Sequence, residues 1–180
     1  MKLLILDLDE TLIYSDFCEP ESFDFSFTLT GKTYWVQKRP HLDYFLQIVA
    51  QHYEIAVWSA ARRDYVDIIV NYLFLPLQIS PVFIFSGERC VHKWKTFPEY
   101  TFIKIKDLKK VWRRRFLVHG VNKRYKRENT FIVDDTRVTY CRNRGNAVRI
   151  QGYRGGTDRE LLRLVVDLLM WKEIEDVRRR

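Results

Sequence analysis

Short apolar runs that end in polar residues recur along the chain and predict the strands of a parallel sheet. These runs cover residues 3–6, 54–58, 82–85, 130–133 and 147–150. They lack the alternation of a half-exposed strand, which is typical of strands buried on both faces. Apolar residues also recur at helical spacing, at residues 42–49, 66–73 and 161–169. Strands that alternate with helices predict an α/β fold, in which helices cover a parallel sheet.

Two segments interrupt this alternation. Residues 23–36 begin with alternating aromatic residues, pass through a turn at Gly31 and resume a β-type pattern. They predict a β-hairpin with one aromatic face. Residues 88–105 alternate unevenly and contain Pro98, which indicates a basic loop or a second small hairpin. We expect residues 1–180 to form one domain that carries both segments as inserts.

Composition narrows the class of protein. The chain has 47% hydrophobic and 30% charged residues, which is ordinary for a globular protein. We expect no membrane span, since no apolar run approaches the ~20 residues required. Acids interrupt the apolar N-terminus, unlike a signal peptide. The three cysteines are widely spaced, which argues against a disulfide scaffold or zinc site and predicts a cytoplasmic location, or a nuclear one in a eukaryote.

The net charge of +8 is concentrated in one part of the chain. Residues 93–127 contain 13 Lys or Arg and two acids, a net +11, so the remainder sums to −3. A basic surface of this kind attracts phosphorylated proteins, nucleic acid or acidic lipids. The alternative is a solvated basic face without a partner.

Two acids, Asp7 and Asp9, directly follow the first apolar run. Side chains two residues apart in an extended chain point the same way. Buried carboxylates are costly in an apolar core, but open α/β sheets bind ligands where their strands end. The alternative is a polar turn in which Asp and Thr cap the next element.

Other strand ends supply further polar groups. Ser59 follows the second run, Lys106 follows the region of the third, and Asp134 and Asp135 follow the fourth. The carboxyl ends of parallel strands share one edge of the sheet, so we expect these groups to converge with the first two acids. Capping explains any one of them, but it does not explain the whole ordered set.

This ordered set resembles the haloacid dehalogenase (HAD) superfamily of phosphatases. More narrowly, it resembles the FCP/SCP-type protein phosphatases (NLI-interacting-factor-like), which act on the C-terminal domain of RNA polymerase II. The matching pieces are Asp7-Leu-Asp-Glu-Thr-Leu12, Lys38-Arg-Pro-His41, Trp58-Ser-Ala60 with Tyr65, Lys106-Asp-Leu108 and Val133-Asp-Asp135. The resemblance implies a three-layer, Rossmann-like sheet flanked by helices.

The resemblance also implies a Mg²⁺-dependent phosphomonoester hydrolase that forms an aspartyl-phosphate. Asp7 is then the nucleophile, and Asp9 is the general acid and base. The Asp7 carboxylate, the Asp9 main-chain carbonyl and Asp135 are the implied Mg²⁺ ligands, hard oxygen atoms that suit this ion.

Further residues are expected to bind the phosphate. They are Thr11, Ser59 and Lys106, of which Lys106 also steadies the nucleophile. Asp134 is expected to orient Lys106. Some relatives have a phosphate-binding Arg where this chain has Gly87, and Arg89 is a candidate substitute.

The sequence contains no insertion of the ~100 residues that would form a large cap. The aromatic hairpin is the candidate lid, and its expected substrate pocket is lined by Phe17, Phe25, Phe27, Tyr34 and Tyr65. Alternatively, these aromatics pack the hairpin onto the domain.

Three functions remain open on the sequence alone. The first is a phosphatase of phospho-Ser or phospho-Thr in proteins. The second keeps the chemistry but acts on nucleic-acid ends, nucleotides or other small phosphomonoesters, as the basic segment suggests. The third is a non-catalytic basic binding module, which the complete set of acids and Lys106 disfavours.

Overall fold

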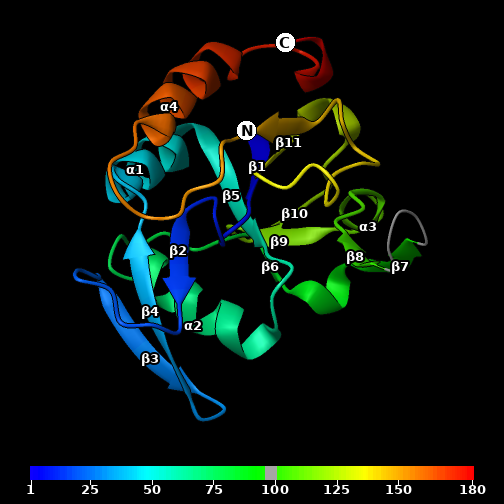
Figure 1. The fold of residues 1–180 in the computed structure, drawn as a ribbon. Coiled ribbons are helices and arrows are strands. Elements are labelled where there is room, and N and C mark those ends of the chain that lie inside the picture. Colours follow the sequence, from blue (N-terminus) through cyan, green and yellow to red (C-terminus); the bar gives the residue numbers. More distant parts are fainter. Residues whose placement is uncertain (96–100) are drawn as a thin grey trace.

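The centre of the molecule is a five-stranded parallel sheet with the strand order β12-β11-β1-β5-β6 (Figure 1). The computed structural model describes residues 1–95 and 101–180. The sheet strands are β1 (Lys2–Leu6), β5 (Tyr53–Trp58), β6 (Ile84–Phe85), β11 (Thr130–Asp134) and β12 (Ala147–Arg149). Each predicted apolar run therefore forms a strand, although the third is shortened to two residues. The α/β fold with a parallel sheet is confirmed.

The central position of β1 places the loop that follows it at the point where the strand order reverses. The chain runs outward from β1 to β5 and β6 on one side, and later fills the other side with β11 and β12. Leu6 pairs with Val57 of β5 and with Val133 of β11, so the three strands end side by side. Open α/β sheets bind ligands in the crevice at such a reversal.

Both faces of the sheet are covered, which explains why the apolar runs do not alternate. Leu4 and Leu6 pack into a core with three helices, whereas Leu3 and Ile5 pack into a second core on the opposite face. The helices of the first face are α1 (Leu42–His52), α2 (Arg63–Phe74) and α4 (Glu160–Trp171). The second face is covered by α3 (Lys109–Trp112) and a hairpin of β9 (Phe116–Val118) and β10 (Val121–Lys123).

The predicted aromatic hairpin is part of a small antiparallel sheet with the order β2-β4-β3, which projects at the lower left of Figure 1. Its strands are β2 (Ile13–Asp16), β3 (Phe25–Leu29) and β4 (Lys32–Lys38). The third strand, β2, was not predicted from the sequence.

The second insert is a hairpin of β7 (Val91–Lys95) and β8 (Thr101–Ile105). Of the two alternatives for residues 88–105, the small hairpin is therefore correct. Residues 96–100 lie outside the described part of the chain.

Candidate active site

The loop after β1 is held in one conformation by main-chain hydrogen bonds. The Asp7 amide donates to the Val133 carbonyl of β11 at 3.1 Å, which extends the pairing of β1 by one residue. The Leu8 carbonyl then accepts from the amides of Thr11, Leu12 and Ile13. Glu10 makes the turn in the left-handed region, with φ 55°. This tight turn keeps the two aspartates at the end of β1.

Asp7, Lys106 and Asp134 form a buried ion-pair triad. The Lys106 Nζ lies 2.6 Å from Asp7 Oδ1 and 2.6 Å from Asp134 Oδ2, and both Lys106 and Asp134 are fully buried. Burial favours a lower pKa for Lys106, but Asp134 and Asp7 outweigh it and raise the pKa above its ordinary value. Lys106 therefore stays charged beside the candidate nucleophile.

Both carboxylate oxygens of Asp134 accept hydrogen bonds from neighbouring groups. Its second oxygen, Oδ1, accepts from the Thr136 amide at 2.9 Å, while Oδ2 accepts from Lys106. An acid with both oxygens bound by donors is suited to orienting Lys106, which is the role that the sequence suggested for it. Asp7 and Asp135 are then the carboxylates better placed to bind a metal ion.

The carboxylates of this region carry more negative charge than Lys106 neutralises. One oxygen from each of Asp7, Asp134 and Asp135 lies within 4.8 Å of the others. Burial raises the pKa of Asp7 well above its ordinary value although Lys106 opposes it, and burial also raises the pKa of Asp135. Three acids facing one ammonium group fit a divalent cation with oxygen ligands.

Asp9 occupies a different environment from Asp7. Tyr65 donates its hydroxyl to Asp9 Oδ1 at 2.5 Å, and Ser59 donates to Oδ2 at 3.4 Å. Burial raises the pKa of Asp9, and the hydrogen bonds from Tyr65 and Ser59 partly offset that effect. The pKa of both acids is raised, but Asp7 is paired with a cation whereas Asp9 contacts only the neutral hydroxyl groups of Tyr65 and Ser59. A carboxyl group with a raised pKa in such surroundings is suited to general acid catalysis.

Thr11 and Ser59 are both fully buried, and their hydroxyl groups contact carboxylates. Thr11 donates to Asp135 Oδ1 at 3.4 Å. The Ser59 hydroxyl oxygen also accepts from the Ala61 amide at 2.9 Å, which fixes the turn after β5. These contacts orient the acids, while direct binding of phosphate by either residue stays a prediction.

A cleft of about 590 Å³ opens above the triad. Asp7, Asp9 and Asp135 line its floor, and Phe102 and Lys104 of β8 line one wall. The second insert therefore forms part of the site. Lys104 was not predicted as a site residue, although its position two residues before Lys106 in an extended strand gives both side chains the same direction.

The aromatic residues expected to form a pocket are only partly brought together. Tyr34 lies 4.8 Å from Phe17, 5.1 Å from Phe27 and 5.2 Å from Tyr65, measured between ring centroids. Phe25 instead stacks on Tyr72 of α2 at 4.2 Å.

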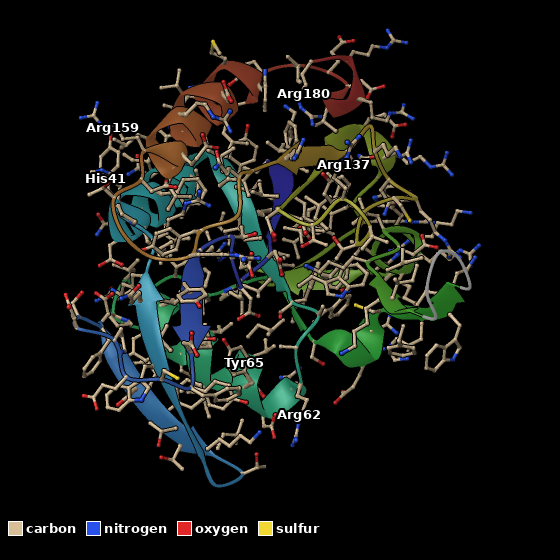
Figure 2. All side chains as sticks on the ribbon, viewed as in Figure 1. His41, Arg62, Tyr65, Arg137, Arg159 and Arg180 are labelled. Carbon is tan, nitrogen blue, oxygen red and sulfur yellow. The ribbon has the colours of Figure 1, made fainter. Side chains whose placement is uncertain are left out.

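A cavity of about 280 Å³ lies between this cluster and Asp9. Tyr34 and Tyr65 line it, together with Leu29 and Arg62, whereas the three phenylalanines do not. Figure 2 shows Tyr65 and Arg62 at the beginning of α2, beside the small antiparallel sheet of β2, β3 and β4. Of the five residues expected to line the substrate pocket, Tyr34 and Tyr65 are therefore the two that line this cavity.

The fold and the site together define a HAD-type α/β protein, with two aspartates after the central strand and a lysine bound to the first. Residues 2–178 match the family model of NLI interacting factor-like phosphatase, and the chain belongs to this family. The resemblance inferred from the sequence motifs is thereby confirmed.

Curated relatives agree with this assignment. A probable C-terminal domain small phosphatase of Dictyostelium discoideum is 30% identical over 183 residues, covering 99% of this chain and 53% of the relative. CTD small phosphatase-like protein of Homo sapiens is 30% identical over 169 residues, covering 91% and 54%. Nuclear envelope morphology protein 1 of Saccharomyces cerevisiae is 28% identical over 188 residues, covering 98% and 40%. The chain spans about half the length of the curated relatives it matches.

A solved structure shows the same fold. The fission yeast RNA polymerase II CTD phosphatase Fcp1, bound to beryllium fluoride, superposes with a TM-score of 0.61 at 16% identity. The match covers 99% of this chain and 52% of Fcp1.

Proposed function

We propose that this protein hydrolyses phosphomonoesters of Ser or Thr in phosphorylated proteins through an aspartyl-phosphate on Asp7. The observation that carries the proposal is the pair of acids after β1 in contrasting surroundings. Asp7 is bound to the buried Lys106, whereas Asp9 is held by Tyr65 and Ser59. The curated relatives with phosphatase names support the same activity.

The proposed reaction has two steps. In the first, the Asp7 carboxylate attacks phosphorus, the bond from phosphorus to the ester oxygen breaks, and Asp9 protonates the leaving oxygen. In the second, Asp9 takes a proton from a water molecule, which attacks phosphorus and releases phosphate from Asp7. Lys106 stabilises negative charge in both steps, because its two ion pairs keep it charged in the buried site.

The carboxylates of Asp7 and Asp135 and the main-chain carbonyl of Asp9 would hold Mg²⁺. When bound, the ion supplies Lewis-acid stabilisation of the phosphoryl oxygens and offsets the repulsion between carboxylate and phosphate. The excess of acids over cations in this cluster supports the proposal.

The cavity next to Asp9 supports a peptide substrate. Its lining combines the aromatic rings of Tyr34 and Tyr65 with Leu29, and it lies beside the residue proposed to protonate the leaving group. An apolar side chain that neighbours a phosphorylated Ser or Thr would bind there. Ser15, Thr30 and Arg62 also line the cavity, so it offers hydrogen-bonding groups to the peptide beside the apolar surface.

Replacing Asp7 with Asn tests the proposed chemistry. We expect Asp7→Asn to lose on the order of 10³-fold or more of the kcat for an aryl phosphate and for a phosphopeptide, as when other enzymes lose a nucleophile. Asp43→Asn changes the charge equally at an exposed position on α1 and is the matched control. Both proteins are assayed with Mg²⁺ and with a chelator. Normal hydrolysis by Asp7→Asn would contradict the proposal.

Phosphate on nucleic-acid ends is the second candidate substrate. A groove of about 620 Å³ is lined by the basic residues Lys109, Arg113, Arg124, Lys126 and Arg127 together with Trp112. Trp112 donates to Thr130 at the beginning of β11, whereas Asp134 lies at the other end of that strand. The basic groove is therefore at the opposite end of β11 from the proposed catalytic residues.

Some of the basic residues in the segment 93–127 form ion pairs within the fold. Lys123 pairs with Glu54, and Lys106 pairs inside the site. We expect oligonucleotide binding that is sensitive to salt and lost on neutralising Arg113, Arg114 and Arg115 if nucleic acid is the partner. No binding at low salt would dismiss this candidate.

The proposed location is the cytoplasm or the nucleus. The relatives from two yeasts are named for nuclear envelope morphology. In the described residues, no helix has the length and apolar character needed to cross a membrane. Imaging of the tagged full chain in its own cells would test the location.

A further inference from the structure

Lys104 places an ammonium group at the wall of the catalytic cleft. Its Nζ donates to the main-chain carbonyl of Ala60 at 2.7 Å, and the residue lines the same cleft as Asp7 and Asp9. Ala60 directly follows Ser59, whose hydroxyl contacts Asp9. The β7–β8 hairpin therefore brings a cation to the loop after β5, next to the proposed reacting groups.

The absence of a side chain at Gly87 makes this position of Lys104 possible. A Cβ at residue 87 would lie 2.4 Å from the Ala60 carbonyl oxygen and 3.0 Å from Lys104 Nζ. The backbone cannot easily move away, because the Gly87 amide donates to the Ala61 carbonyl at 2.7 Å. Gly87 and Lys104 therefore form a matched pair, in which the missing side chain leaves space for the ammonium group.

Lys104 differs from the neighbouring cations in its partners. Lys106 is shared by two carboxylates, and Arg154 pairs with Glu10 at 3.2 Å. Among the described residues, no carboxylate lies within ion-pair distance of Lys104. An ammonium group has three N–H donors, and the Ala60 carbonyl takes one of them. Two donors and a full positive charge thus remain for a ligand in the cleft.

Arg89 is not an equivalent source of charge. Its guanidinium lies over the Phe85 ring at 5.6 Å, and Arg89 is not among the residues that line the cleft. The structure thus points away from Arg89, the substitute that the sequence suggested, and toward Lys104, which lies 15 positions further along the chain.

We propose that Lys104 binds a phosphoryl oxygen of the substrate, on the side of the cleft formed by the Ser59–Ala60 turn. The inference rests on the proposed function, because it assigns a ligand to the same cleft. A charge-assisted hydrogen bond from this wall would hold the phosphate against Asp7 and offset the negative charge of the acids.

The test compares Lys104→Gln with Lys104→Arg. Gln keeps a donor for the Ala60 carbonyl but removes the charge, whereas Arg keeps the charge. Lys93→Gln is the matched control, because Lys93 is exposed on the same hairpin and lies outside the residues that line the cleft. The measurements are the binding of inorganic phosphate by calorimetry, its inhibition constant against an aryl phosphate, and the melting temperature.

We expect Lys104→Gln to bind inorganic phosphate about 10- to 100-fold more weakly, the range for loss of one charged hydrogen bond. Lys104→Arg should recover most of this loss, and Lys93→Gln should behave as the wild type. The inference is overturned if Lys104→Gln binds phosphate normally, even with a lowered melting temperature, or if Lys93→Gln weakens binding equally.

The same experiment separates this inference from the proposed function. A wild-type protein that hydrolyses neither aryl phosphate nor phosphopeptide would overturn the proposed function. The comparison of phosphate affinities would still decide whether Lys104 binds phosphate. Conversely, full hydrolysis by the wild type with unchanged phosphate affinity in Lys104→Gln would retain the function and reject the role of Lys104.

Discussion

Replacing Lys106 with Met should destabilise the fold and also slow the proposed reaction. Lys106 is fully buried and contacts Asp7 and Asp134, each at 2.6 Å. Met has a similar length but no charge, so the two acids would be left beside each other without a cation. Asp134 is itself fully buried and gains no solvent in exchange.

The size of the effect follows from the burial of the triad. Removing one partner of a buried ion pair destabilises a protein by about 3–5 kcal/mol, because the remaining charge is uncompensated. For a chain of this length each kcal/mol lowers the melting temperature by about 2–4 °C, so a decrease of about 6–20 °C is expected. Loss of an electrostatic contact to the reacting groups should lower kcat by about 10²- to 10³-fold.

The assay is urea unfolding of the wild type, Lys106→Met, Asp134→Asn and the double variant, all in a chelator so that no divalent cation replaces the lost charge. Removing the Asp134 charge should restore part of the stability lost in Lys106→Met, with a coupling of about 1–3 kcal/mol. Lys93→Met is the control for loss of a lysine at an exposed site. Additive effects in the double variant, or a destabilisation below about 1 kcal/mol for Lys106→Met, would refute the reasoning.

Two further predictions concern stability. Gly87→Ala should lower the free energy of unfolding by about 1–3 kcal/mol, because the new Cβ would lie 2.4 Å from the Ala60 carbonyl oxygen. An unchanged urea midpoint would contradict the tight contact. The second prediction concerns the ion pair between the buried Arg39 and Asp158, with Nε and Nη2 at 3.0 and 2.8 Å from the two carboxylate oxygens. Partial burial favours a higher pKa for Asp158, but the hydrogen bonds from Arg39 and a main-chain amide outweigh it and leave the pKa below its ordinary value. The stability advantage of the wild type over Asp158→Asn should therefore be complete above about pH 4 and decline as the pH falls further, as measured by unfolding midpoints between pH 6 and 3; an advantage independent of pH would contradict this.

Buried strands were the part of the fold that the sequence predicted well. Residues 3–6 and 130–134 are buried, on both faces of the sheet, so the amino-acid pattern within each segment is enough to predict a strand. By contrast, the short strand β2 has the sequence Ile-Tyr-Ser-Asp, in which only Ile13 is buried. It becomes a strand by pairing with β4, whose paired residues lie 19 to 25 positions further along the chain, and a local pattern does not contain that information.

The convergence of Asp7, Ser59 and the Asp134–Asp135 pair could be predicted because each lies at the end of a strand of one parallel sheet. Lys106 instead follows β8 of the second insert, so its place in the site depends on how that hairpin packs. Contacts that depend on the packing of side chains were harder to foresee. The separation of Phe25 from the other aromatics arises from its stacking on Tyr72 of α2. The position of Lys104 depends on the missing side chain at Gly87, and nothing in the sequence links these two positions.

Both inserts are closed at their base, and this has a consequence for how the family can diversify. Ile13 pairs with Lys38 where the first insert leaves and rejoins the body, and Val91 pairs with Ile105 at the second. The length of each insert can therefore change beyond its paired base without separating the strands of the parallel sheet that position Asp7 and Asp134. Replacing residues of either insert other than Lys104 would then change the surroundings of the proposed site, while the residues proposed to bind and react with phosphate stay in place.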